Sequence, residues 1–244
     1  MNGIFKDKNS ARNYVWQRLE TEFFALEPFP VWNRIPNFKG AEVAARKLFN
    51  LEPWSSASSL KIGPDSALAY VRVEALRRGI KVYVPTPRLA GAFMLLDPEK
   101  IVTEQIVHAS ARENFAEYSK AVGLSDLPHF DGIVAGSVAV TKDGRRAGKG
   151  AGYSDLEFAL LRELGHSPVP VATIVHEAQI VEGFPVEITD QRLHSIATPS
   201  SVWLTGVDLK DAPSQIDWSL IGRDIIASMP PLQEIYERAK QKNK

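Results

Sequence analysis

The sequence predicts an α/β fold in which a mainly parallel or mixed β-sheet is covered by helices on both faces. Short strand-like runs alternate with amphipathic helical segments along the chain, and this alternation is typical of strand–helix–strand units. Two of the runs, residues 132–136 and 169–175, are almost entirely apolar. Strands of a parallel sheet have this composition because both of their faces are buried.

Composition narrows the classes of protein that are possible. The 244 residues, 44% of them hydrophobic, suit one domain over residues 1–244 with a sizeable core. The chain has no cysteine, which excludes disulfides, thiolate metal sites and cysteine nucleophiles. Lys plus Arg equals Asp plus Glu at 29 each, so bulk charge does not favour a nucleic-acid partner. No apolar run is long enough to span a membrane, and the N-terminus lacks a signal-peptide core, so we expect a cytoplasmic protein.

The expected elements follow in order along the chain. Residues 27–38 hold three prolines and three aromatics and predict a rigid extended segment, whereas 101–128 give mixed helix and loop patterns. Helices are predicted at 10–26 with Ser10 as N-cap, 40–49, 65–78, 153–164, 218–228 and 231–240. Strands are predicted at 60–63, 81–85, 92–96, 132–136, 138–141, 169–175 and 202–206.

Residues 144–155, with the sequence GRRAGKGAGYSD, form the most informative stretch of the chain. Glycines at 148, 150 and 152 allow positive φ and close approach to the backbone amides. Successive amides in such a loop form an anion-binding concavity, and the N-terminus of the following helix adds partial positive charge. With the flanking Arg145, Arg146 and Lys149, the loop suits a polyphosphate. Asp155 is a candidate ligand for the magnesium ion that a nucleotide brings.

Two known phosphate motifs do not fit this stretch. It is not a Walker A loop, because Lys149 is followed by glycine and not by Ser or Thr. It is also a poor Rossmann fingerprint, since the spacing is G-x-G-x-G and no acidic residue follows at the usual distance. The plain alternative is a flexible basic turn between a strand and a helix.

A second pair of cations lies at the start of the first predicted helix. Lys8 and Arg12 are four residues apart, so they share one helix face if the helix starts a little before residue 10. Two cations at a helix N-terminus oppose the macrodipole, which points to an anionic partner. The alternative is an ordinary solvated surface pair.

Several motifs, taken together and in order, resemble one family. They are the Lys-x-x-x-Arg pair on the first helix, Pro87-Arg88 at a strand end, the 144–155 loop, HEAQIV at 176–181, FPVE at 184–187, Asp190, and IAT at 196–198. This set resembles the 5-formyltetrahydrofolate cyclo-ligase family, also called methenyltetrahydrofolate synthetase, whose loop is Gly-x-Arg-x-Gly-Arg-Gly-x-Gly-Tyr-Tyr-Asp. The segments RIPNFKGA at 34–41 and VPTPRL at 84–89 are most similar to its methenyltetrahydrofolate synthetase domain-containing branch.

The resemblance implies a fold, a reaction and a set of roles. The fold is a three-layer α/β/α sandwich like that of the ribose-phosphate isomerase and CoA-transferase group. The reaction is the cyclisation of 5-formyltetrahydrofolate, a small-molecule substrate, to 5,10-methenyltetrahydrofolate with ATP and Mg²⁺, by a monomer or homodimer. The implied ATP contacts are Lys8, Arg12, Arg146, Gly148, Lys149, Gly150, Gly152 and Tyr153; the implied magnesium ligands are Asp155 and Asp190. Lys149 and Tyr153 would act in catalysis, and Asp65, Arg88 and Tyr153 would contact the substrate.

The chain departs from the family pattern at four places. Lys149 stands where the family usually has arginine, which replaces a bidentate fork by a point charge. Ser154 replaces the second tyrosine of the loop and removes an aromatic wall. Pro64-Asp65 replaces an expected glutamate, and Thr189 precedes Asp190 where many members have histidine. The phosphate half of the pattern is therefore better kept than the folate half.

These departures leave two alternatives beside the cyclo-ligase. One is an ATP-dependent enzyme that acts on another small carbonyl or amide compound. The other is a non-catalytic module that keeps a nucleotide site. The five histidines show no metal-ligand spacing, and only His176, at a strand end, lies near the predicted site.

Overall fold

An eight-stranded mixed sheet forms the centre of the protein, here described from a computed structural model that covers residues 3–86, 93–213, 216 and 218–242. The strand order is β12-β11-β10-β7-β3-β4-β5-β6, and the five strands from β11 to β4 are mutually parallel. β12, β5 and β6 each run antiparallel to the neighbour that precedes them in the chain. The bounds are β3 Ser59–Ile62, β4 Lys81–Pro85, β5 Phe93–Leu96, β6 Ser119–Val122, β7 Gly132–Val134, β10 Val171–Ile174, β11 Ser195–Ala197 and β12 Val202–Leu204.

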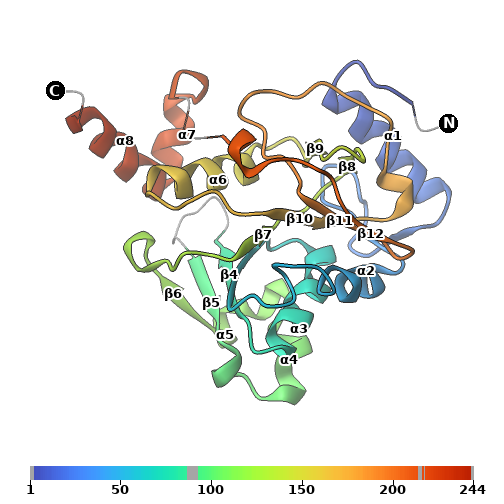
Figure 1. The fold of residues 1–244 in the computed structure, drawn as a ribbon, viewed down its shortest axis with the longest axis horizontal. Helices are drawn as coiled ribbons and strands as arrows, with labels where there is room; N and C mark the ends of the chain where they lie inside the picture. Colours follow the sequence, from blue (N-terminus) through green and yellow to red (C-terminus); the bar gives the residue numbers. More distant parts are fainter. Residues whose placement is uncertain (1–2, 87–92, 214–215, 217, 243–244) are drawn as a thin grey trace.

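Helices cover both faces of this sheet, which confirms the predicted α/β class with a mostly parallel, mixed sheet (Figure 1). One apolar cluster joins one face of β3 and β4 to α2 and α3, and a second joins the opposite face to α6 and α8. The helices are α1 Lys8–Thr21, α2 Ala41–Leu48, α3 Ala69–Arg77, α4 Ile106–Ala109, α5 Phe115–Tyr118, α6 Tyr153–Glu163, α7 Arg223–Ser228 and α8 Pro230–Lys242. That one domain extends over residues 1–244 stays a prediction.

Alternation along β3 decides which side chains face which layer. Leu60 and Ile62 are fully buried in the cluster with α2 and α3. Lys61, between them, points to the opposite face, because successive side chains of a strand alternate. A lysine thus enters the layer that contains α6.

The first helix begins two residues earlier than predicted. Its N-cap is Asp7, whose carboxylate accepts a hydrogen bond of 2.7 Å from the amide of Ser10. The prediction of Ser10 as the cap was therefore wrong, because the carboxylate three residues earlier satisfies that orphan amide. The earlier start puts Lys8 in the first helical position. The helix packs through Ala11, Val15 and Leu19 in a third apolar cluster.

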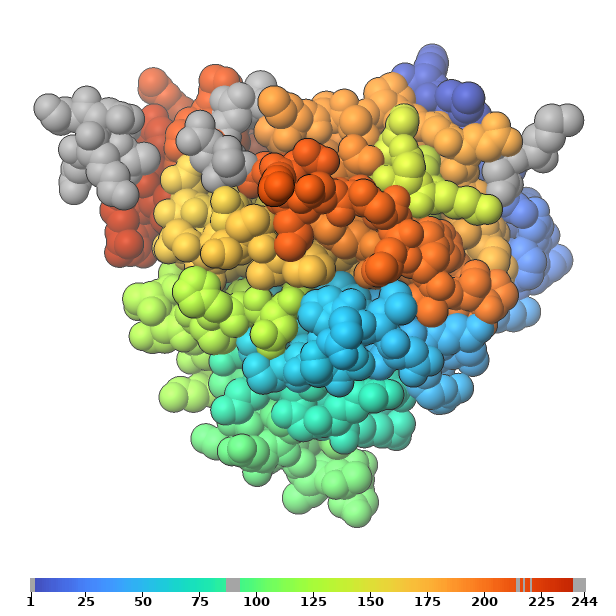
Figure 2. Space-filling view, viewed as in Figure 1, coloured from blue at the N-terminus to red at the C-terminus, as the bar shows by residue number. Residues whose placement is uncertain are grey.

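Two short hydrogen-bonded pairs flank the main sheet. β1 (Ala25–Leu26) pairs with β2 (Asn37–Phe38), so the segment predicted as extended folds back on itself. β8 (Ala139–Val140) pairs with β9 (Arg146–Ala147) and forms the hairpin that leads into the glycine loop. Gly144 lies in its turn with φ of +88°. The amide of Phe5 donates to the carbonyl of Gly183 at 2.8 Å, and Figure 2 shows the dark blue N-terminal segment against the orange one.

The elements that the sequence did not predict are short. β11 has three residues and β6 has four, too few for a pattern of period two to stand out. β6 and two one-turn helices, α4 and α5, occupy the segment with mixed patterns, 101–128. The helix predicted at 218–228 is instead a 3-10 turn at Trp218–Leu220 followed by α7. The remaining predicted strands and helices are present with ends moved by a few residues, and Ala92 lies outside the described residues.

Candidate active site

A cavity of about 1010 Å³ opens at the carboxyl edge of the parallel strands. Its walls include the segments that follow β3, β4 and β7, together with the start of α1, the glycine loop and the start of α6. β3 and β7 are neighbours in the sheet, but the chain goes from β3 to β4 on one side and from β7 to β10 on the other. Ligands of open α/β sheets bind at this kind of switch point, beyond the carboxyl ends of the strands.

The glycine loop forms one wall of the cavity. Gly150 and Gly152 have backbone φ angles of +100° and +70°, values that residues other than glycine rarely adopt. Gly152 is the N-cap of α6, so the helix begins at the cavity and directs its positive end into it. Lys149 is exposed on the same loop, and Tyr153 lines the cavity as the first residue of α6.

Arg146 is fixed beneath the loop and is only 4% exposed. Its guanidinium donates to the carbonyl of Gly136 and to Oδ1 of Asp155, both at 2.9 Å, and its buried Nε has no hydrogen-bond partner among the described residues. A Cβ on Gly148 would lie 2.9 Å from Nη1 of Arg146. Glycine at 148 thus allows the loop to pass directly over this guanidinium.

Helix α1 brings its two cations to the same cavity. Nε of Arg12 donates to the carbonyl of Gly148 at 2.6 Å, and the guanidinium carbon lies 3.5 Å from where a Cβ of Gly150 would be. Lys8 donates to Oδ1 of Asp190 at 2.5 Å. Burial lowers the pKa of Arg12, and the nearby charge of Arg146 lowers it further. Cations held this close together are a favourable place for an anion.

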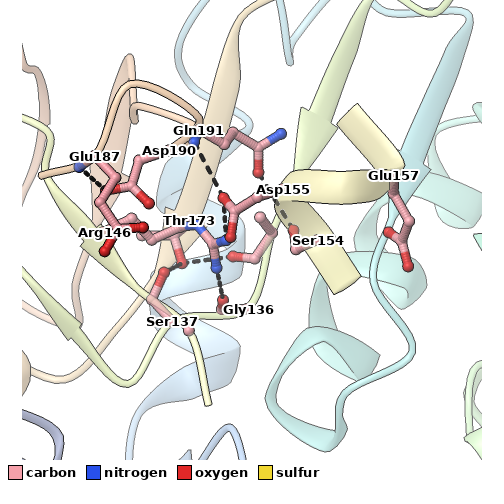
Figure 3. A network of polar contacts seen from close by, with 12 residues as sticks. Gly136, Ser137, Arg146, Ser154, Asp155, Glu157, Thr173, Glu187, Asp190 and Gln191 are labelled. Atoms are coloured by element: carbon pink, nitrogen blue, oxygen red, sulfur yellow. Dashed lines mark hydrogen bonds and ion pairs between the residues drawn. The ribbon is translucent and has the colours of Figure 1, made fainter. Parts of the chain in front are cut away.

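The two predicted magnesium ligands are brought together by one hydrogen bond. The amide of Gln191, next to Asp190, donates to Oδ1 of Asp155 at 3.0 Å (Figure 3). Asp155 retains a second oxygen without a hydrogen bond from the described residues, while Asp190 accepts from Lys8 and from the amide of Glu187. Among the described residues no three acidic or histidine side chains form a ready-made metal cluster. Two carboxylates beside a phosphate site do suit Mg²⁺, which takes its other ligands from phosphates and water.

The predicted substrate residue Asp65 lies at the other side of the switch point, after β3. Its carboxylate packs against Gly63 and Gly136; a Cβ on Gly136 would lie 2.6 Å from Oδ2. Burial raises the pKa of Asp65, and the charges of Lys149 and Arg72 partly offset the rise. Arg88, the other predicted substrate contact, lies outside the described residues.

A buried arginine fixes the loop that carries Asp65. Arg72 of α3 is fully buried, and burial lowers its pKa to about 9. It donates to the carbonyls of Gly63, Asp65 and Ser110. The loop after β3 is therefore held from below by a charge-assisted network.

Ser154 and His176 have structural contacts. The hydroxyl of Ser154 donates to Oε1 of Gln191 at 3.3 Å and ties α6 to the 187–191 segment. His176 accepts from the amide of Ala178 and stacks on Phe24 at 4.0 Å between ring centroids. His176 does not line the cavity and is not part of this site.

The sequence reasoning missed an ion pair that also lines the cavity. Nζ of Lys61 lies 2.5 Å from Oε2 of Glu157, with side chains 1% and 11% exposed. A lysine at the centre of an otherwise buried strand was the feature that could have revealed it, because such a charge requires a partner.

Comparison with known proteins decides the family. The sequence model of the 5-formyltetrahydrofolate cyclo-ligase family matches residues 8–199. The chain belongs to this family. The family match includes the predicted ATP contacts and both predicted magnesium ligands, from Lys8 to Asp190.

Curated relatives agree with this assignment. The chain is 38% identical over 244 residues to the methenyltetrahydrofolate synthase domain-containing protein of Mus musculus and 34% identical to that of Homo sapiens. Each match includes 97% of this chain, which spans 65% of the mouse relative and 63% of the human one. It is also 31% identical over 133 residues to the 5-formyltetrahydrofolate cyclo-ligase of Escherichia coli strain K12, with 52% of this chain and 68% of that protein included.

A solved structure shares the fold. The 5,10-methenyltetrahydrofolate synthetase of Aquifex aeolicus superposes with a TM-score of 0.53 at 15% identity, over 82% of this chain and 94% of that one. Within the described part of this cyclo-ligase family member, no helix has the length and apolarity that crossing a membrane requires.

Proposed function

We propose that this protein catalyses the ATP- and Mg²⁺-dependent cyclisation of 5-formyltetrahydrofolate to 5,10-methenyltetrahydrofolate. The observation that carries the proposal is the convergence of Lys8, Arg12, Arg146 and Lys149 on one cavity at the carboxyl edge of the sheet. Four cations and a helix N-terminus in one place match the charge of a nucleotide triphosphate. The cavity volume of about 1010 Å³ lies at the upper end of the range of about 300–1,000 Å³ that is usual for ligand pockets, as a site for a nucleotide and a second small molecule requires.

In the proposed reaction, ATP phosphorylates the formyl oxygen of the substrate and leaves as ADP. N10 then attacks the activated formyl carbon, the ring closes, and inorganic phosphate departs with the former formyl oxygen. The protein needs to form no covalent intermediate, because phosphoryl transfer is accelerated mainly by positioning the reactants and stabilising the charge of the transferring group. The substrate would lie on the Asp65 side of the cavity, with the phosphates on the side of the glycine loop.

The residues around the proposed phosphate site would have different roles. Arg146 is already oriented by Gly136 and Asp155, so it offers a fixed charge under the loop. Lys149 is exposed at the cavity and would offer its ammonium to the transferring group as a point charge. Asp155 and Asp190 would hold Mg²⁺, which supplies neutralisation of phosphate charge when bound.

The product has its own near-ultraviolet absorbance, which allows a direct test. We expect absorbance to appear only when enzyme, ATP, Mg²⁺ and 5-formyltetrahydrofolate are all present. A reaction without ATP and a reaction of the Lys149→Ala variant are the controls. If no product forms at high enzyme concentration while calorimetry shows that ATP binds, the protein does not act on 5-formyltetrahydrofolate. The proposal that it binds ATP would still hold.

The carboxylate contacts favour one further candidate, a nucleotide-binding module without catalysis. Asp190 is paired with Lys8, and Asp155 with Arg146, so Mg²⁺ must compete with two cations. ATP would raise the melting temperature of such a module, but the module would not hydrolyse ATP with any substrate. The remaining alternative, an ATP-dependent enzyme for another small compound, would hydrolyse ATP in a substrate screen without a response to reduced folates.

A further inference from the structure

A second cavity, of about 300 Å³, lies outside the site described above. Its walls come from the segments that lead into β7 and β10 and from the second half of α6. These segments lie at the amino edge of two parallel strands, opposite the edge where the active-site cavity opens. None of the described residues lines both cavities. The volume is at the lower end of the range for ligand pockets, which suits a molecule with one ring.

Most of the wall of this second cavity is apolar and aromatic. The ring of Phe130 lies almost parallel to that of His166, with 14° between the planes and 6.1 Å between the centroids. Helix α6 and the ends of the two strands add four aliphatic and aromatic side chains, Ile133, Phe158, Leu161 and Val169. A flat apolar body would lose most of its contact with water here, which favours its binding.

The polar part of the wall is basic. Arg162, His129 and His166 line the cavity, and no acidic side chain of the described residues does so. The guanidinium of Arg162 donates to the carbonyl of His166, and it forms no ion pair with any described residue. Nε of Arg162 and Nδ1 of His166 are buried without a hydrogen-bond partner in the described part of the chain. A partly buried guanidinium is ordinarily paired with a carboxylate, so this one retains the capacity to bind an acid.

The plain alternative is that these cations serve the C-terminal end of α6, where the helix macrodipole is negative. Backbone amides already satisfy that end. The amide of Gly165 donates to the carbonyl of Arg162 at 3.0 Å, and the amide of His166 donates to that of Leu161 at 3.1 Å. Gly165 has a φ of +87°, the conformation that ends many helices. The full charge of the guanidinium outweighs the partial charge of about half a unit at the helix end, which leaves a net attraction for an anion.

We propose that this second cavity binds a small carboxylic acid with a flat apolar body, of the type of benzoate. The carboxylate accepts hydrogen bonds from the guanidinium of Arg162 and from the imidazole of His166, and the body packs against Phe130 and the apolar side chains of α6. Burial lowers the pKa of His166, and the neighbouring His129 lowers it further, so this ring is neutral at pH 7 and supplies a hydrogen bond without a charge. The inference is independent of the proposed function, because it concerns the opposite edge of the sheet.

Benzoate is the probe that tests the site, and benzamide, which has the same shape without the charge, is its matched control. Methyl groups observed by NMR report where each compound binds. Changes at Ile133, Leu161 and Val169 mark the second cavity, whereas changes at Ile216 and Ile221 mark the active-site cavity. We expect benzoate to shift the first set with a dissociation constant below about 1 mM. It should bind at least about tenfold more tightly than benzamide, the scale of a hydrogen bond to a charged group.

Variants identify the group that recognises the acid. Arg162→Gln should lose the preference for benzoate over benzamide, and Arg162→Lys, which retains the charge, should keep part of it. Arg223→Gln removes an exposed arginine that lines neither cavity, so it should keep the whole preference. Val169→Phe places a ring in the second cavity and should abolish binding of both compounds there.

Three results would overturn the inference. One is the absence of shifts at Ile133, Leu161 and Val169, which would restrict the acid to the active-site cavity or exclude binding. Another is equal affinity for benzoate and benzamide, which would show an apolar pocket that does not recognise the carboxylate. The third is an unchanged preference in folded Arg162→Gln. If that variant does not fold, Val169→Phe decides, because unchanged benzoate binding in it would exclude this cavity.

Discussion

Nε of Arg12 donates a 2.6 Å hydrogen bond to the carbonyl of Gly148, across 136 positions of sequence. This contact places the first helix on the glycine loop. It also brings the guanidinium close to Gly150, and both Arg12 and Arg146 line the cavity. Two motifs that lie far apart in the sequence therefore line one cavity, where we propose that the phosphates bind.

Replacement of Lys149 by alanine should weaken binding of Mg-ATP by about 1–3 kcal/mol, the scale of a lost charge-assisted hydrogen bond. Isothermal titration calorimetry measures the change. Lys142→Ala is the matched control, since Lys142 is exposed on the same hairpin but does not line the cavity. If the folded Lys149→Ala variant binds Mg-ATP with an unchanged dissociation constant, the loop is not the phosphate site.

In a crystal structure with a non-hydrolysable ATP analogue, we expect Lys8 and Arg12 to contact the phosphates. Lys8 would exchange Asp190 for a phosphate oxygen and release that carboxylate for Mg²⁺. The Arg12→Lys variant should bind ATP more weakly, because a point charge replaces a planar fork that also holds Gly148. Side chains of both residues directed to bulk solvent would contradict this prediction and favour a plain surface pair.

The stability of the protein should depend on pH through Asp65. Burial raises the pKa of this carboxyl above its ordinary value of 3.8, against the opposing charges of Lys149 and Arg72. Stability from the neutral form is complete below the unfolded pKa and is lost as pH rises through the folded pKa. Asp65→Asn should therefore melt at a higher temperature than the wild type at pH 7, and the difference should shrink towards pH 3.5.

Thermal melts of both proteins between pH 3.5 and 8 test this dependence. Asp126→Asn, at an exposed position, is the control for the loss of one negative charge. A difference in melting temperature that stays constant across the whole pH range would show that Asp65 ionises as easily in the folded protein as in the unfolded chain.

Two glycines with similar backbone angles should differ in their tolerance of alanine. Gly144 and Gly206 have φ of +88° and +82°. A Cβ on Gly144 would lie 2.3 Å from the carbonyl oxygen of Leu193, whereas no atom of the described residues lies within 4 Å of one on Gly206. Gly206→Ala should cost only the backbone strain, about 1–2 kcal/mol, and Gly144→Ala should cost clearly more. Urea unfolding of both variants provides the comparison, and equal losses would rule out the steric explanation.

The sequence by itself determined the class of fold and predicted the glycine loop as a phosphate site. Apolar strands between amphipathic helices fix a parallel core, because each strand must bury both faces. The glycines at 148, 150 and 152 are local features, since positive φ and close approach are properties of single residues. The Lys8–Arg12 spacing is local for the same reason, being set by the turn of one helix.

Tertiary structure alone decided the partners of those residues and the other half of the cavity. Asp7, and not Ser10, caps α1, and Asp155 accepts a hydrogen bond from the amide of Gln191. Sequence spacing alone does not predict either contact. The pairing of Lys61 with Glu157 depends on which face of β3 meets α6, and that is set by packing of the whole sheet. A charge buried in the low dielectric of the interior needs an opposite charge beside it, but only the fold decides which residue supplies that charge.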